Sequence, residues 1–503
     1  TPRSTLFPYT TLFRSQEEQS LMKKILFAAS EAVPFIKTGG LADVVGSLPK
    51  AYNRDEFDVR VVLPKYRVIP EYFQQQMEYM TNFYINMSGR MIYVGVFQMM
   101  LDGVTFYFID NEYYFSGDRI YEDGLWDLEK FAYFSKAALT MLCVIDFRPD
   151  IIHCHDWQTG LMPVYLKNEF WDSSSYSDFY QNMKAVMTIH NLKFQGTWNI
   201  DDMMRVTGLP GYLFTSDKLE AYGAGNYLKG GLVYADWITT VSGVYANEIK
   251  YPFYGEGLDG LMRARSNNLS GIVNGIDYDE YNPETDPMLV HNYSPYNFRT
   301  EKVHNKTALQ QELGMQVDGG KFMIGLVSRL TDQKGMDLID CVMEQICAED
   351  VQFVILGTGD PRYENMFRYY EWKYKDRVSA SICYDNTRSH RIYGACDAFL
   401  MPSLFEPCGL SQLMSLRYGT LPIVRETGGL KETVEPYNEY TGSGTGFSFA
   451  NYNAHEMLHV IEYAKSVYYG DREAWNRIVD RAMAADFSWG NSARKYEDLY
   501  RSL

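Results

Sequence analysis

Two lysines and an arginine stand where an α/β protein would bind an anion. Lys37 precedes a Thr-Gly-Gly-Leu sequence at 38–41, and Arg329 and Lys334 lie at and just after the end of the strongly apolar stretch 321–330. Ligands of α/β sheets bind beyond the carboxyl ends of the strands. Arginine offers a planar fork of donors to phosphate oxygens, and lysine offers a mobile point charge. The three side chains indicate a phosphate site, although a lysine such as Lys37 is more often simply solvated.

The Thr-Gly-Gly-Leu sequence occurs a second time, at 427–430. Paired glycines between a strand and a helix let backbone N–H groups approach an anion at the helix N-terminus. One such loop is more often only a tight turn. Two copies, one in each half of the chain, fit a ligand that is held between the halves.

A third candidate is the stretch from Glu406 to Ser411, Glu-Pro-Cys-Gly-Leu-Ser, which opens a predicted helix. The free N–H groups and the dipole of a helix N-terminus suit a diphosphate.

Other motifs favour neither a metal nor a dinucleotide. His153, His155 and Asp156 resemble a metal site, because alternate residues of a strand face the same way, but no third and fourth ligands are evident nearby. Asp277 and Asp279 form a D-x-D motif, for which we expect no metal. The G-x-G at 357–359 lacks the third glycine of a dinucleotide fingerprint, and no G-x-x-x-x-G-K-[ST] occurs.

Composition limits the partners of the chain. Its 503 residues, 46% of them hydrophobic, exceed what one core normally holds, so we expect two domains. The net charge of −17 repels nucleic acid and anionic membranes, and no run of about 18 apolar residues could span a membrane. An anionic ligand therefore needs a local positive cluster.

Cysteine usage indicates a reducing compartment. The seven cysteines are an odd number and include no C-x-x-C pair, which argues against a disulfide framework and a structural zinc site. We expect a cytoplasmic protein.

These residues must be positioned by alternating strands and helices, the pattern of a parallel α/β sheet. The apolar runs that predict strands in the first half are 24–30, 58–64, 91–99, 149–156, 184–191 and 236–242. The pattern restarts near residue 270, and the runs of the second half are 271–277, 321–330, 351–359, 397–403 and 421–427. Two doubly wound halves with a cleft between them follow, with a boundary near residue 266.

The beginning of the chain has two distinct parts. Residues 22–30 imitate a signal peptide, but their apolar run is short and Glu31 follows it, so a buried first strand is predicted. Residues 5–15 resemble the in-frame translation of a common sequencing adapter. We expect residues 1–21 to be an artefactual or disordered leader.

A series of longer motifs carries a family resemblance over residues 22–503. The motifs, in chain order, are 37–50, 149–161, 188–196, 274–283, 327–335, 402–413, 417–430 and 486–496. Together they resemble the bacterial glycogen synthases and plant starch synthases. The resemblance implies two Rossmann-like domains facing a central cleft, the GT-B fold. It also implies transfer of glucose from ADP-glucose to the non-reducing end of an α-1,4-glucan such as a glycogen primer, with retention of configuration and no cofactor or metal.

The resemblance also implies roles for individual residues. The residues assigned to catalysis are Lys37, Asp156, His190, Arg329, Lys334 and Glu406. Those assigned to the donor are Lys37, Gly39, Gly40, Asp43, Asn274, Arg329, Lys334, Tyr384, Cys408, Gly409, Leu410 and Ser411. Glu406 would contact the donor glucose. The wider superfamily often has a second glutamate eight residues later, but Met414 stands there. Tyr384 would stack on the adenine, with a buried structural tyrosine as the alternative.

The resemblance also implies two domains: residues 22–265 for the glucan acceptor and residues 266–486 for the nucleotide sugar. A final helix at 487–503 is expected to pack back on the first domain. Two alternative functions remain. One is a retaining transferase of the same fold with another donor or acceptor, such as UDP-glucose or a sucrose-type product. The other is an inactive glucan-binding homologue.

Overall fold

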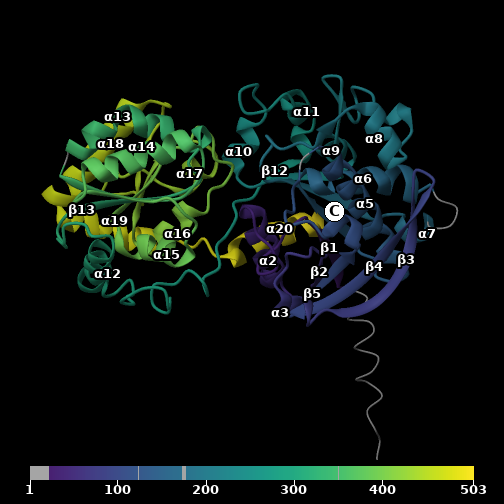
Figure 1. The fold of residues 1–503 in the computed structure, drawn as a ribbon, viewed down its shortest axis with the longest axis horizontal. Coiled ribbons are helices and arrows are strands. Elements are labelled where there is room, and N and C mark those ends of the chain that lie inside the picture. Colours follow the sequence, from purple (N-terminus) through teal and green to yellow (C-terminus); the bar gives the residue numbers. More distant parts are fainter. Residues whose placement is uncertain (1–21, 123, 173–176, 349) are drawn as a thin grey trace, which may run out of the picture. The chain divides into compact units, whose positions relative to one another are not determined.

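The structure is a computed structural model that describes residues 22–122, 124–172, 177–348 and 350–503. The expected leader at 1–21 lies outside these residues. The described chain forms two compact units, which are described separately (Figure 1). Unit 1 comprises residues 22–239, Ala264–Leu269 and Ala493–Leu503, and unit 2 comprises Thr240–Arg263 and Ser270–Ser492.

A nine-stranded sheet contains most of the strands of unit 1. Its spatial order is β12-β11-β7-β6-β1-β2-β5-β4-β3. The bounds are β1 Lys23–Ala28, β2 Phe57–Pro64, β3 Glu78–Met87, β4 Arg90–Leu101, β5 Val104–Asp110, β6 Ile151–His155, β7 Lys184–Ile189, β11 Trp237–Thr240 and β12 Leu269–Gly271. β1 pairs in parallel with β2 and β6, so the run that imitates a signal peptide forms a central strand. β3, β4 and β5 are antiparallel, and the sequence reading missed β3 and β5.

The central strands of this sheet follow the doubly wound order. If β1, β2, β5, β6, β7 and β11 are numbered 1 to 6 along the chain, their spatial order is 3-2-1-4-5-6. The order reverses between β1 and β6, and this switch point is where such sheets bind ligands.

Short helices and one long helix accompany this sheet. Their bounds are α2 Gly40–Ser47, α3 Glu71–Gln74, α4 Glu112–Phe115, α5 Gly124–Val144, α6 Leu161–Tyr165, α7 Ser177–Tyr180, α8 Ile200–Thr207 and α9 Tyr227–Tyr234. A small sheet of β8 (Thr197–Trp198), β10 (Ala224–Asn226) and β9 (Glu220–Ala221) completes the unit.

The last helix, α20 (Trp489–Ser502), ends in unit 1. Tyr500 OH lies 2.6 Å from His153 Nδ1 and 3.2 Å from Tyr52 OH, and Glu497 accepts a hydrogen bond from Asn53 N at 2.9 Å. The apolar face of the helix is thereby joined to the core around β1 and β6.

Unit 2 is a Rossmann-like unit of six strands with the order β15-β14-β13-β16-β17-β18. The bounds are β13 Phe322–Val327, β14 Val351–Leu356, β15 Val378–Ser381, β16 Ala398–Met401, β17 Leu421–Arg425 and β18 Phe447–Phe449. All neighbouring strands of this sheet pair in parallel. The order is again 3-2-1-4-5-6, with the switch point between β13 and β16.

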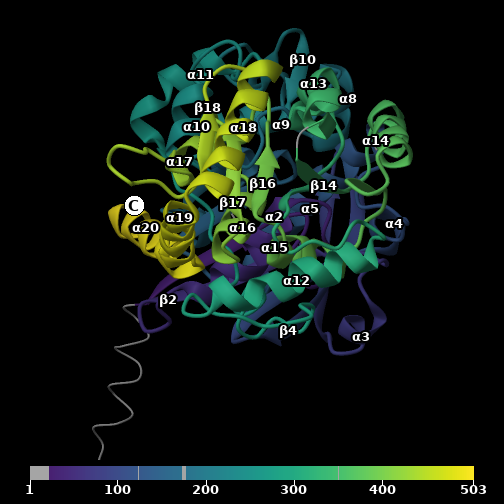
Figure 2. The same ribbon diagram turned by 90° about the vertical axis from the view of Figure 1, so that its left-hand side faces the viewer.

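Figure 2 turns unit 2 toward the viewer and shows its helices around the strands. The bounds are α10 Gly243–Glu248, α11 Asp259–Ala264, α12 Phe298–Glu312, α13 Met336–Ala348, α14 Pro361–Lys373, α15 Asn386–Ala395, α16 Ser411–Arg417, α17 Gly428–Thr433, α18 Ala454–Gly470 and α19 Arg472–Ala484.

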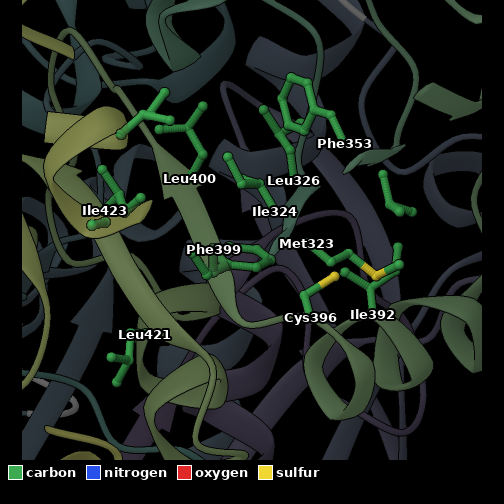
Figure 3. Packing of buried hydrophobic residues seen from close by; sticks show 14 of the residues in the cluster. Met323, Ile324, Leu326, Phe353, Ile392, Cys396, Phe399, Leu400, Leu421 and Ile423 are labelled. Carbon is green, nitrogen blue, oxygen red and sulfur yellow. The ribbon is translucent and has the colours of Figure 1, made fainter. Parts of the chain in front are cut away.

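The core of unit 2 is built from the strands that the sequence predicted. Ile324, Phe399 and Ile423, from β13, β16 and β17, are fully buried in one cluster (Figure 3). Ile392 of α15 joins them. A Cβ on Gly325 would lie 2.6 Å from Ile392 Cγ2, so the glycine lets the helix pack closely against the sheet.

One predicted strand is wrong. The run 271–277 was expected to open the second half, but β12 ends at Gly271 and belongs to the nine-stranded sheet. The rest of the run is irregular because its backbone bonds elsewhere: Ile276 N donates to Phe487 O at 2.9 Å. The polar Asn274-Gly275 pair interrupts the apolar pattern at this point.

No helix among the described residues is long and apolar enough to cross a membrane.

Candidate functional site

The candidate residues of unit 1 follow β1 and β6, the two strands at its switch point. After β1, Lys37 to Gly40 are exposed, and α2 begins at Gly40. Lys37 Nζ lies 2.7 Å from Asp43 Oδ1 in the first turn of α2. Burial raises the pKa of Asp43, and the Lys37 ammonium opposes that shift. Lys37 is therefore a member of a local ion pair and not simply a solvated lysine.

A glutamate that sequence reasoning missed holds the first Thr-Gly-Gly-Leu loop. Glu31 is buried, and its carboxylate accepts hydrogen bonds from Thr38 N, from Thr38 Oγ1 at 2.9 Å and from Gly39 N at 3.3 Å. Gly40 N has no partner within the described part of the chain. Of the paired glycines, only Gly40 therefore still has an N–H group free for an anion.

Asp156 stands directly after β6 with a strained backbone, at φ +57°. Its buried carboxylate accepts a hydrogen bond from His190 N at 2.7 Å, which brings together two residues that the sequence placed 34 apart. Burial raises the pKa of Asp156 to about 7, and the nearby Glu31 carboxylate adds to the shift.

A chain of neutral histidines lies beside Asp156. His155 Nδ1 is 3.0 Å from His190 Nε2, and the rings of His153 and His155 stack at 4.3 Å, as expected for alternate residues of one strand. Burial lowers the pKa of both His153 and His190 to about 3. These imidazoles are uncharged at neutral pH. No group of three or more metal-ligating side chains occurs among the residues that the structure covers.

The candidate residues of unit 2 follow β13 and β16 at the corresponding switch point. Arg329 is exposed, and its guanidinium has no partner in the described ranges. Lys334 ends a short 3₁₀ helix, Asp332–Lys334, and its Nζ lies 2.5 Å from Glu406 Oε2. The sequence assigned Lys334 and Glu406 separate roles, whereas the structure joins them in one ion pair.

Glu406 is 6% exposed and lies in the loop between β16 and α16. Ser403 Oγ donates to Glu406 Oε2 at 3.1 Å, so the carboxylate has a fixed orientation. Met414 is buried within α16, so the position eight residues later is an apolar core position and holds no second carboxylate.

The residues after Glu406 lead into α16, which begins at Ser411 with Leu410 as its N-cap. Gly409 has φ +72°, a conformation that glycine adopts readily. Cys408 is buried, and burial raises the pKa of its thiol to about 12. Asn274 N bonds the Cys408 sulfur, while Asn274 Oδ1 is buried without a partner in the described structure. A buried, unpaired amide oxygen is suited to receive a ligand hydroxyl or amine.

Tyr384 is 84% exposed in the loop between β15 and α15. The alternative of a buried structural tyrosine is therefore wrong.

The second Thr-Gly-Gly-Leu loop does not offer its amides to a ligand, which corrects the prediction for 427–430. Gly428 N donates to Glu248 Oε1 at 3.0 Å, and Gly429 N donates to the carbonyl oxygens of Glu406 and Pro407, both at 3.1 Å. The repeated sequence could not reveal this, because Glu248 lies 180 residues from Gly428 along the chain.

The D-x-D motif has a local structural role. Asp277 Oδ1 accepts a hydrogen bond from Asp279 N at 2.8 Å, which closes a turn after Asn274-Gly275.

Comparisons with known proteins agree with this geometry. Residues 24–264 match the family "Starch synthase catalytic domain", and residues 314–478 match "Glycosyl transferases group 1". The chain is 69% identical over 482 residues to a glycogen synthase of Lachnospira eligens, covering 96% of this chain and 100% of that protein.

Two solved structures share the fold. The catalytic domain of starch synthase IV from Arabidopsis thaliana, bound to ADP and acarbose, matches with a TM-score of 0.86 and 33% identity, covering 96% of this chain and 99% of that one. A sucrose-phosphate synthase from Thermosynechococcus elongatus, at 17% identity and a TM-score of 0.60 over 95% of this chain and 98% of that one, is similar in fold alone. The predicted fold class is confirmed, and the chain belongs to the glycogen synthase and starch synthase family of glycosyltransferases.

Proposed function

We propose that this protein is a cytoplasmic glucosyltransferase that moves glucose from ADP-glucose to the non-reducing end of an α-1,4-glucan with retention of configuration. Family membership supports the reaction class, and ADP is the nucleotide bound in the starch synthase IV structure. All seven cysteines are free, as a reducing compartment favours.

The observation that carries the proposal is the cluster at the switch point of unit 2. The unpaired Arg329 and the Lys334–Glu406 pair follow the carboxyl ends of β13 and β16. These are the positions where a sheet of this order receives a nucleotide. In a protein with a net charge of −17, the unpaired Arg329 guanidinium supplies the local positive charge that an anionic donor needs, because Glu406 balances the charge of Lys334.

We assign the donor to unit 2 and the glucan acceptor to unit 1. Arg329 and Lys334 bind the diphosphate, the amides that lead into α16 contact the same group, and the exposed Tyr384 stacks on the adenine. Asn274 Oδ1 and Glu406 contact the donor's sugars. For unit 1 taken by itself, we assign phosphate binding to the exposed Lys37–Gly40 loop, with Asp43 beside it, and glucose contacts to Asp156 and His190.

The proposed chemistry is a front-face substitution. The bond from the anomeric carbon to the phosphate oxygen breaks, and the acceptor 4-hydroxyl attacks from the same side. Buried, neutral His190 is poorly suited to carry the proton, so the departing phosphate oxygen takes it. The protein then acts by orienting both substrates and by stabilising the charge that develops on the sugar and the diphosphate.

The test compares initial rates with ADP-glucose and UDP-glucose on glycogen, with the anomeric configuration of the new linkage read by NMR. We expect faster transfer from ADP-glucose and an α-1,4 product. Faster transfer from UDP-glucose would favour the first alternative, and no turnover with either donor would favour the inactive homologue. Arg329→Lys is a useful comparison because it keeps the charge and loses the fork, so it should weaken ADP binding.

A further inference from the structure

Two short helices of unit 2, α10 and α17, each supply a carboxylate to the N-terminus of the other. Glu248, the last residue of α10, accepts hydrogen bonds from Gly428 N at 3.0 Å and from Thr427 Oγ1 at 3.1 Å. Glu432 of α17 accepts from Val244 N, in the first turn of α10, at 3.0 Å. The two helices therefore run antiparallel. We call this pair the α10–α17 clasp.

The two carboxylates of the clasp differ in burial. Glu248 is half-buried, whereas Glu432 is exposed. A hydrogen bond from a backbone N–H to a carboxylate is stronger where water is partly excluded. Glu248 is therefore the stronger of the two contacts.

The first turn of α17 directly contacts the backbone of the Glu406 loop. Gly429 N donates to the carbonyl oxygens of Glu406 and Pro407. A Cβ on Gly428 would lie 1.9 Å from Glu406 O, and a Cβ on Gly429 would lie 2.1 Å from Cys408 O. Only glycines allow this approach, so the loop and the first turn of α17 lie in direct backbone contact.

The first turn of α10 contacts the same loop from its own side. Ser242 caps α10 by accepting from Tyr245 N at 3.0 Å, and its hydroxyl donates to Pro407 O at 2.7 Å. Pro407 O thus accepts hydrogen bonds from both helices of the clasp, and Glu406 O accepts one from α17.

We propose that Glu248 is a positioning residue for Glu406. It holds α17 in register, and α17 in turn holds the Glu406 backbone, so that the side chain keeps its orientation toward the donor sugar. This inference rests on the role given to Glu406 in the proposed function. Gly428 and Gly429 then serve as contact points of a rigid support and not as a phosphate loop.

The experiment measures kcat, the KM for ADP-glucose and the Tm of Glu248→Ala and Glu248→Gln. A small displacement of a reacting group can cost about 10²-fold in rate. We expect kcat to fall by about 10- to 10²-fold in Glu248→Ala and by less in Glu248→Gln, which keeps an oxygen acceptor. KM should change by less than about threefold, on the same argument that only positioning is lost.

Glu371→Ala is the matched control. Glu371 of α14 also accepts a backbone hydrogen bond within unit 2, from Ala380 N at 2.8 Å, but no contact joins it to the Glu406 loop in the described structure. Its loss should lower the Tm about as much as Glu248→Ala does while leaving kcat unchanged. An unchanged kcat in folded Glu248→Ala, or an equal fall in kcat for the control, would overturn the inference.

A double-mutant cycle separates positioning from general stability. In the Glu406→Gln background, Glu248→Ala should cost less than about twofold in kcat, because the group that it positions is already lost. Equal costs in the two backgrounds would show that Glu248 acts independently of Glu406. If Glu406→Gln alone keeps normal activity, the proposed role of Glu406 fails, whatever Glu248 does.

Discussion

At the scale of single residues, the ion pair between Lys334 and Glu406 changes what a mutation at either position will do. The sequence supported one role for each: the ammonium for phosphate, the carboxylate for sugar. At 2.5 Å, with Glu406 only 6% exposed, each side chain also balances the charge of the other. Removing one partner therefore leaves the other with an uncompensated charge.

Glu406→Gln should lower kcat by ~10²–10³-fold, the usual cost of losing one preorganised polar contact to a charge-developing transition state. ADP affinity should stay equal or rise, because Lys334 loses its internal partner and has more charge to offer the phosphates. Steady-state kinetics and calorimetric titration with ADP measure the two effects. Near-normal turnover in a folded variant, or ADP affinity that falls in step with kcat, would contradict the assignment.

Asp156 should make stability depend on pH. Its folded pKa of about 7 lies above the unfolded value of about 3.9, so its contribution is fully present below about pH 3.9 and is lost as the pH rises through 7. Asp156→Asn cannot ionise. The difference in Tm, variant minus unmodified protein, should rise between pH 4 and pH 8. A Tm difference that stays constant over this range would show that Asp156 ionises normally.

At the scale of elements, the sequence predicts the buried parallel strands but not the polar or short strands. Runs such as 24–30 and 321–330 are almost wholly apolar, and they became the central strands β1 and β13. β15, Val-Ser-Ala-Ser at 378–381, has one large apolar side chain and no pattern to detect. β3 is the edge strand of its sheet, and only two of its ten residues are buried.

The sequence identified the candidate ligand contacts of the site but not the residues that support them. Lys37, Arg329 and Glu406 stand in recognisable motifs in the loops that follow strands. Glu31 and Glu248, which hold the two Thr-Gly-Gly-Leu loops, stand in no motif. A carboxylate that binds backbone N–H groups of another segment depends on tertiary contact, and one sequence contains no signal of that contact.

The close approach of α17 to the Glu406 loop gives a steric prediction. Gly429→Ala would place a methyl group 2.1 Å from Cys408 O, at a position whose φ is not in the left-handed region. The loop must therefore move, and kcat should fall by at least about tenfold, since misplacement alone can cost up to about 10²-fold.

Gly470→Ala is the control for that variant, because a Cβ there meets nothing within 4 Å. It should leave kcat unchanged. Wild-type kcat in folded Gly429→Ala would mean that the loop does not need its observed position.

At the scale of the whole molecule, the same strand order occurs twice, and each unit presents candidate residues at its own switch point. The repeated Thr-Gly-Gly-Leu sequence marks different positions in the two units. The first copy follows strand 1 of its sheet, and the second follows strand 5. Equal sequence therefore does not mean an equal place in the fold, and the backbone N–H groups of the second loop are bonded within the protein.

The charge distribution predicts that no divalent metal is required for activity. We expect the unpaired Arg329, with the ion-paired Lys334 and Lys37, to provide the positive charge that a metal provides in other transferases. Initial rates with ADP-glucose should be unchanged after incubation with EDTA and removal of the chelator. Activity that is lost with EDTA and restored by magnesium or manganese would contradict this and would direct attention to Asp277 and Asp279.

The return of α20 to unit 1 has a consequence for the order of synthesis. Domains generally fold as they emerge from the ribosome, N-terminal first. Here the Tyr500 hydroxyl contacts His153 and Tyr52, and Lys23 Nζ of β1 donates to the Tyr500 carbonyl oxygen, so the core around β1 stays incomplete until residues 493–503 are made. At about 5–20 residues per second, the intervening chain takes on the order of tens of seconds to synthesise. During that time unit 1 exposes apolar surface that α20 later covers. We expect a chaperone that binds nascent chains to bind this surface.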